Sequence, residues 1–192
     1  MLIENEIVDY EKNKLDIDHW VLLKGEYRYK RIITFLKIKN IECTWKNISN
    51  YVRYDKRILI NSLKYIVFLE EMYKSFVVKY KGEKNTKVLS QSFDNSYNEF
   101  LSLGDMAKYD GVDLELMKKE HKAINSFRNS VVHNKILIDR TFASKKLEEV
   151  MDVFMQILPK TYRRGFIKNI NECIVKLDLD NYWHIVLPLG DK

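Results

Sequence analysis

The chain has 192 residues, a formal net charge of +6 and 46% hydrophobic residues, a composition ordinary for a folded globular protein. Only 6 glycines and 2 prolines are present, so long helices with few tight turns are expected. Met1–Lys14 has no signal-peptide core, no apolar run could span a bilayer, and Cys43 and Cys173 form no metal-ligand or disulfide pattern. We therefore expect a cytoplasmic protein with no membrane contact, no metal and no cofactor.

Positive charge is concentrated in one part of the chain. Between Lys24 and Lys64 there are eleven lysines and arginines but three acidic residues, a net charge of +8, which leaves the rest near −2. This asymmetry suggests an anionic partner, most commonly nucleic acid, although a solvated basic surface explains it equally well. The cations for which we predict contacts with RNA are Arg28, Lys30, Arg31, Lys56, Arg57 and Lys135.

Several aromatic residues lie among these cations. Rings beside lysine and arginine can stack on unpaired bases, but they more often pack into the core. Both roles are open for Tyr27, Trp45, Tyr51 and Tyr54.

The first half of the chain is predicted to form several helices, of which the last is the longest. Helical spacing is weak before residue 24 and clear over 26–39, and Thr44 has the position of an N-cap for a short helix over 45–54. Asp55 has the position of an N-cap for the longest helix, about 56–81. The segment 81–86 is expected to be a loop.

The second half continues as helices and ends in a tail. Asp113 is expected to cap a helix that reaches about Ile138, and Trp183, Ile185 and Leu187 in the tail either pack or form a short strand. The fold class is predicted to be all-α, with a four-helix core, in one domain. The predicted helices in this half are 92–103, 113–138, 144–158 (starting at Thr141 or Ser144) and 161–177. We divide the domain into three parts: a basic helical extension (1–54), a core bundle (55–158), and a C-terminal helix and tail (159–192).

The most informative residues lie on the helix expected from 113 onward. An arginine such as Arg128 can neutralise a phosphate, and an imidazole such as that of His133 can accept or give a proton, so the two could handle a phosphate by acid–base chemistry. An ordinary solvated helix edge has the same spacing. Positions five apart on an ideal helix diverge by about 140°. The two side chains therefore converge only if the helix ends or distorts near Val132, or if a second copy of the chain completes the site.

One acidic residue falls inside an apolar stripe. Glu70 lies on the inward face of the helix expected over 56–81, where a lone carboxylate would be costly to bury. It either pairs with a cation, for which Arg128 is the expected partner, or reaches water at the edge of the stripe. His121 lies two turns before Arg128 and is expected to be structural, whereas His19 and His184 are expected on the surface.

Arg128-Asn129, followed after three residues by His133-Asn134, resembles the motif of the HEPN ribonucleases. That motif is an arginine, often followed by asparagine, and then a histidine after four to six residues; here four residues separate them. A second segment, Tyr54–Leu59 together with Phe68–Glu71, is similar to the first long helix of the abortive-infection (Abi-type) HEPN proteins. The resemblance covers about residues 44–140.

The resemblance implies a HEPN-like bundle that forms a homodimer with an active site shared between the two copies. It also implies metal-independent RNA cleavage by attack of the 2′-hydroxyl, in an anti-phage effector or toxin that an antitoxin would restrain. His133 would then be the general base or acid, Arg128 would neutralise the transition state and Asn129 would orient the histidine, with Glu70 and Asn134 in support. The alternative is a non-catalytic HEPN-like module that binds RNA, a nucleotide or a protein.

One position departs from the family pattern. Some HEPN toxins carry a tyrosine two residues after the histidine, where a partner nucleotidyltransferase modifies it. Here that position is Lys135, so this mode of regulation is not expected.

Overall fold

The computed structural model describes residues 3–82 and 90–188. Its regular elements are helices, which confirms the predicted all-α class, and within those ranges the only β pairing is an isolated bridge between Phe142 and Lys145. None of the helices in these ranges is both long and apolar enough to cross a membrane. The α-helices are α1 (Tyr10–Lys24), α2 (Glu26–Ile38), α3 (Trp45–Lys81), α4 (Phe93–Leu101), α5 (Leu114–Val132), α6 (Leu147–Ile157) and α7 (Lys160–Asn171); the 3-10 helices are η1 (Glu4–Glu6), η3 (Gly104–Ala107) and η4 (Glu172–Ile174).

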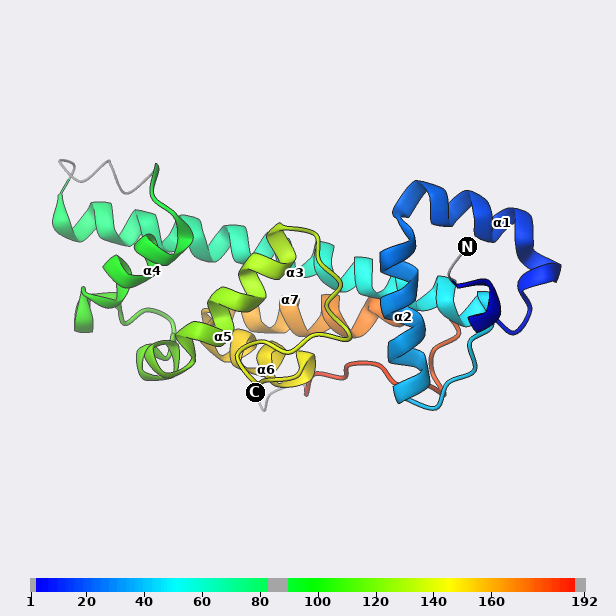
Figure 1. Cartoon of the computed structure of the whole chain (residues 1–192). Coiled ribbons are helices and arrows are strands. Elements are labelled where there is room, and N and C mark those ends of the chain that lie inside the picture. Colours follow the sequence, from blue (N-terminus) through cyan, green and yellow to red (C-terminus); the bar gives the residue numbers. More distant parts are fainter. Residues whose placement is uncertain (1–2, 83–89, 189–192) are drawn as a thin grey trace.

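Helix α3 is the axis of the molecule. It has 37 residues, which corresponds to a length of about 55 Å. Figure 1 shows α1 and α2 against its N-terminal half, α4 and α5 toward its C-terminal half, and α7 alongside it. Thr44 caps the start as predicted, because its side chain accepts a hydrogen bond from the amide of Asn47.

The predicted break at Asp55 is wrong. Asp55 lies within α3, and its side chain is fully buried rather than placed at a helix start. No glycine or proline interrupts residues 45–81, so nothing in the backbone stops the helix there. The Asp55 carboxylate instead accepts hydrogen bonds from the amides of Leu137 and Ile138, far along the chain. Helix α3 therefore runs through the predicted boundary between the extension and the core.

Helix α5 starts as predicted but ends early. The side chain of Asp113 accepts from the amide of Leu116, whereas the last helical residue is Val132 instead of one near Ile138. Asn134 adopts a left-handed conformation with a φ of 52°, and the amide of Lys135 donates to the carbonyl of Ser130. This pattern, completed by a bond from the Asn134 amide, is a Schellman motif, which ends a helix and turns the chain.

The remaining boundaries differ from prediction by a few residues. Helix α4 is capped by Ser92, α6 begins after Lys146 rather than at Thr141 or Ser144, and α7 ends at Asn171 before η4. Most of the predicted loop 81–86 lies outside the described residues. In the tail, Ile185 and Leu187 are buried without forming a strand, and Trp183 packs against Phe35 and Tyr54.

Most aromatic residues of the basic segment belong to the core. Tyr51 and Tyr54 are fully buried, Trp45 is buried, and its ring stacks on that of Tyr29 with 5.6 Å between centroids. Their position excludes stacking on a nucleic acid in this conformation. Tyr27 is the exception, because it is 66% exposed.

Candidate functional site

The first polar cluster surrounds Arg128 on α5. Its guanidinium Nη2 lies 3.3 Å from Glu70 Oε2 on α3, which confirms the predicted pairing of these two residues. Glu70 also accepts from Lys74 Nζ at 2.9 Å, so one carboxylate serves two cations. The guanidinium carbon lies 5.3 Å from the centre of the Phe93 ring, a cation–π distance. The Arg128 side chain remains 20% exposed, which leaves it accessible at one edge.

Asn129 is bound to Arg128 and not to His133. Its Oδ1 accepts from Arg128 Nη1 at 3.1 Å, so the amide fixes the orientation of the guanidinium. Asn129 was predicted to orient His133, but in the described part of the chain no side-chain hydrogen bond joins these two residues. Only the backbone joins the two, through the amide of His133 and the carbonyl of Asn129.

His133 is exposed at the end of α5. It is the C-cap residue, and its imidazole makes no hydrogen bond or ion pair with any residue in 3–82 or 90–188. The helix does end near Val132, one of the two arrangements that the sequence left open. Even so, no contact within one copy joins the imidazole to Arg128.

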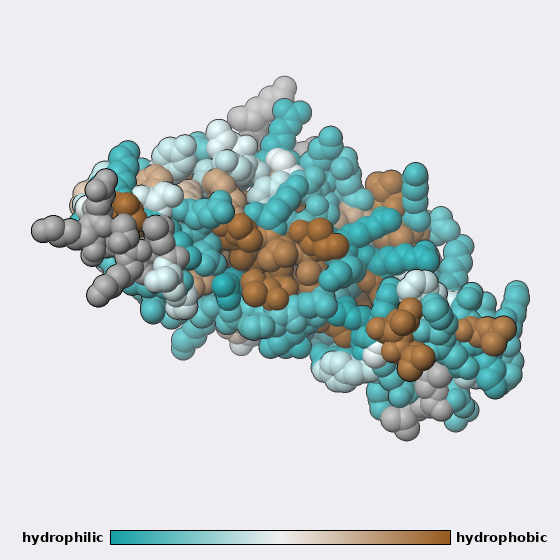
Figure 2. Space-filling model, turned by 90° about the horizontal axis from the view of Figure 1, so that it is seen from above, coloured by the Kyte–Doolittle hydropathy of each residue, from teal (hydrophilic) through white to brown (hydrophobic). Residues whose placement is uncertain are grey.

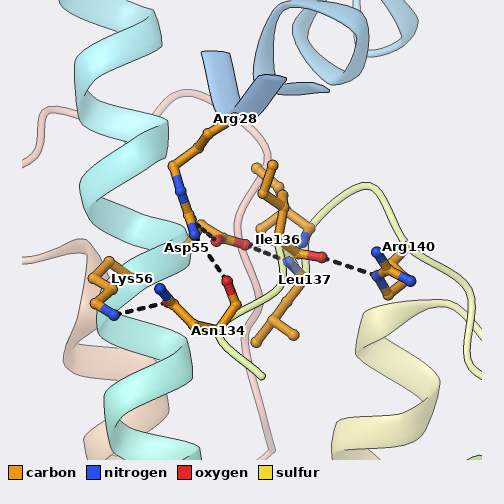
Figure 3. Close-up of polar contacts among 8 residues, drawn as sticks. Arg28, Asp55, Lys56, Asn134, Ile136, Leu137 and Arg140 are labelled. Atoms are coloured by element: carbon orange, nitrogen blue, oxygen red, sulfur yellow. Dashed lines mark hydrogen bonds and ion pairs between the residues drawn. The ribbon is translucent and has the colours of Figure 1, made fainter. Parts of the chain in front are cut away.

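The second polar cluster lies directly after His133 (Figure 3). Arg28 Nη2 on α2 donates to the carbonyl oxygen of Asn134 at 2.9 Å, and Arg28 Nη1 lies 3.3 Å from Asp55 Oδ2. Asp55 Oδ1 accepts from the amides of Leu137 at 2.7 Å and Ile138 at 3.1 Å. This single buried carboxylate therefore ties α2 and the loop after α5 to α3.

Burial is the dominant influence on Asp55. It raises the pKa of this carboxyl from 3.8 to about 6, although the two amide N–H groups and Arg28 act in the opposite direction. Sequence reasoning missed this residue, because an acidic residue ahead of an apolar run resembles a helix cap. The available signal was the unbroken helical pattern on both sides of Asp55.

The predicted RNA-binding cations divide into two groups. Arg28, Arg31 and Lys135 line one hollow. Asn134 also lines this hollow, and its Oδ1 accepts a hydrogen bond from Lys56 Nζ. Two others lie elsewhere. Lys30 is exposed outside this hollow, and Arg57 donates to the carbonyls of Cys173 and Val175, so it caps the end of η4.

An exposed apolar patch separates the two clusters. Positions 56, 60, 63, 67 and 70 fall within an arc of about 80° on an ideal helix. Ile60 is 55% exposed and Val67 is 45% exposed. Figure 2 shows hydrophobic residues gathered in the middle of one face of the molecule. Arg128 contacts Glu70 and Asn134 contacts Lys56, so the end of α5, which carries the exposed Val132, accompanies the α3 segment between them. We call Ile60, Leu63, Val67 and Val132 the motif patch.

His121 has partners of its own on the same helix as Arg128. Its Nε2 lies 2.7 Å from Asp94 Oδ1, and its ring stacks on Tyr97 with centroids 4.8 Å apart. Asn125 donates to the same carboxylate oxygen. These contacts fit the predicted structural role. Within 3–82 and 90–188, no group of three histidine, cysteine or acidic side chains is placed to hold a metal.

Comparison of the chain with protein-family models, with curated proteins and with solved structures finds no significant match. The geometry of the site offers a partly exposed arginine, an imidazole without a partner in the described chain, and a cluster of cations beside it.

Proposed function

We propose that the protein is a metal-independent endoribonuclease of the HEPN type, acting as a homodimer in phage defence or as a toxin. The observation that carries this proposal is the end of α5. The Schellman turn at Asn134 leaves His133 exposed directly after Val132 of the motif patch, and Arg128 lies one and a half turns earlier on the same helix. An acid–base group and a cation thus lie near each other along the last turns of α5.

A second copy on the motif patch would bring the two halves of the site together. The patch is apolar at its centre and polar at its rim, the usual anatomy of a protein interface. With a two-fold axis through the patch, each copy would present its own imidazole and guanidinium to a common cleft. This arrangement supplies the convergence that a single copy lacks.

RNA cleavage in this cleft would use His133 for proton transfer and Arg128 for charge stabilisation. One His133 imidazole removes the proton of a ribose 2′-hydroxyl, whose oxygen attacks the adjacent phosphorus. The bond from phosphorus to the 5′-oxygen breaks, and the protonated His133 of the other copy gives its proton to that oxygen. Arg128 stabilises the extra negative charge on the phosphoryl oxygens. The products are a 2′,3′-cyclic phosphate and a 5′-hydroxyl, and DNA is not cut because it lacks the 2′-hydroxyl.

The test is cleavage of RNA by purified protein in EDTA, compared with Arg128→Ala and His133→Ala. We expect each variant to lose at least a hundredfold in rate, since acid–base and electrostatic contributions typically have this size. The matched controls, His19→Ala and Arg164→Ala, remove exposed residues of the same types and should retain full activity. A DNA strand of the same sequence should stay intact. Equal activity in the two test variants would identify a contaminant and defeat the proposal.

A second candidate function is a non-catalytic module that binds RNA, a nucleotide or a protein. It is favoured by the contacts of Arg128 with Glu70 and Asn129, which occupy much of its hydrogen-bonding capacity inside one copy. Such a module would bind RNA with strong salt dependence but leave it uncut. Its binding would be unchanged in His133→Ala.

A further inference from the structure

A basic pocket lies between the start of α2 and the loop after α5. It has a volume of about 240 Å³, and Asn134 and Lys135, the two residues after His133, form part of its wall. Five cationic side chains of residues 3–82 and 90–188 line it. They are Lys24, Arg28, Arg31, Lys135 and Arg140.

Positive charge in the basic pocket is only partly balanced. Arg28 is paired with Asp55, and Arg31 is paired with Asp139. For the other three cations, no carboxylate of residues 3–82 or 90–188 lies within ion-pair distance. The pKa of Lys24 is lowered, first by partial burial and then by the charges of neighbouring cations. A bound anion would relieve this repulsion.

The walls of the basic pocket are held together before any ligand arrives. Oδ1 of Asp55 accepts from the amides of Leu137 and Ile138, and Oδ2 pairs with Arg28 (Figure 3). Arg28 in turn donates to the carbonyl of Asn134 in the opposite wall. Donors fixed in this way lose little conformational freedom on binding, which favours affinity.

Tyr27 adds an aromatic surface at the rim of the basic pocket. It is 66% exposed, and its hydroxyl accepts a hydrogen bond from Arg31 Nη1 at 3.2 Å, which steadies the ring. A guanidinium fork suits phosphoryl oxygens, and an exposed ring suits a base. The pocket thus combines the two features that a nucleotide unit requires.

We propose that the basic pocket binds the phosphoryl group of a nucleotide unit whose base stacks on Tyr27. This inference rests on the proposed function only for the identity of the ligand as RNA, since binding here requires no cleavage. Because the pocket begins at the residue after His133, it would hold another phosphate of the strand that is cut. It would thereby set the position of the strand in the site.

The test is binding of the full chain to three probes: inorganic phosphate, AMP, and a ten-nucleotide single-stranded RNA with 2′-O-methyl groups that prevent cleavage. Lys135→Glu and Arg140→Glu should each weaken binding of the oligonucleotide at least tenfold. Each should also reduce the slope of log K against log salt by about 0.7 for every phosphate that the variant no longer neutralises. The matched control is Arg164→Glu on α7, which is exposed, lies outside the pocket and should change affinity less than threefold.

Tyr27→Ala tests the contribution of the base to binding separately from that of the phosphate. We expect it to weaken binding of AMP about fivefold or more, because the base can no longer stack, and to leave inorganic phosphate unchanged. If AMP displaces the oligonucleotide, the pocket accepts a free nucleotide. If only the oligonucleotide binds, the phosphoryl group comes from the strand.

Two results would overturn the inference: equal weakening by Arg164→Glu and Lys135→Glu, or binding insensitive to every pocket variant. The variant His133→Ala distinguishes the proposed cleavage from the proposed binding in the pocket. It should lose cleavage and still bind the oligonucleotide normally. Pocket-dependent binding by a protein that cleaves no RNA would refute the nuclease and leave the pocket standing.

Discussion

Two carboxylates on α3, Glu70 and Asp55, are each paired with an arginine of another helix, but they differ in burial. Glu70 is 22% exposed, shares its charge between Arg128 and Lys74, and faces partly into water. Asp55 is 0% exposed, and donors from two other segments fill both of its oxygens. A partly hydrated pair can rearrange at low cost, whereas a buried pair cannot lose one partner without leaving a charge uncompensated. The comparison suggests an adaptable contact at Arg128 and a structural clamp at Asp55.

The sharpest way to break this comparison is to remove each carboxylate. Asp55→Ala should lower the free energy of unfolding by about 3–5 kcal/mol, because Arg28 and two buried amides lose their acceptor. Glu70→Ala should cost less than about 1 kcal/mol, as for a partly exposed ion pair. Urea denaturation followed by circular dichroism measures both. Similar losses in the two variants would refute the distinction.

Dependence of stability on pH sharpens the comparison further. The pKa of Asp55 is raised by burial to about 6 in the folded chain, against 3.8 as its ordinary value. A raised pKa means that stability from this group is fully present below about pH 4 and is lost as the pH rises through 6. The loss corresponds to about 3 kcal/mol.

The measurement is the free energy of unfolding between pH 4 and 7, for the wild-type protein and for Asp55→Asn. Asparagine keeps an oxygen for the amides of Leu137 and Ile138 but does not titrate. The difference between the two proteins should therefore shrink as the pH rises. A constant difference would show that Asp55 does not change its charge in this range.

The motif patch between the two carboxylates provides the smallest expected effect. Val67→Lys should weaken self-association about a hundredfold, because a lysine would be buried without a partner in the proposed interface. Leu22→Lys is the matched control, since Leu22 is 84% exposed on α1, away from the motif. Sedimentation equilibrium over a range of concentrations gives the association constant. Unchanged association of Val67→Lys would remove the motif patch from the interface.

The difference between the two carboxylates also explains what the sequence could reveal. Glu70 sits within a helical apolar stripe, so the spacing predicts either a cation partner, for which Arg128 is the choice, or contact with water; the structure shows the pairing and a partly exposed carboxylate. Asp55 finds two of its partners more than 80 residues away, at Leu137 and Ile138. No local pattern indicates such a contact.

The end of α5 was mispredicted for a related reason. Ile136, Leu137 and Ile138 extend the apolar content of the helix, and this favoured a helix as far as 138. Three consecutive apolar residues are buried here because the loop packs back onto α3, not because the helix continues. The left-handed residue Asn134 was the local signal for the turn. The pairing of two copies and the role of His133 remain predictions.

The unbroken course of α3 makes it a molecular ruler. Lys56, beside the basic pocket, and Glu70, beside Arg128, are separated by 14 positions on one straight helix, which corresponds to about 21 Å. A stacked nucleic-acid strand advances about 3.4 Å per nucleotide, so about six nucleotides cover that interval. An oligonucleotide shorter than this would reach either the basic pocket or Arg128 but not both. The spacing of these two positions along α3 would therefore set the minimum length of a substrate.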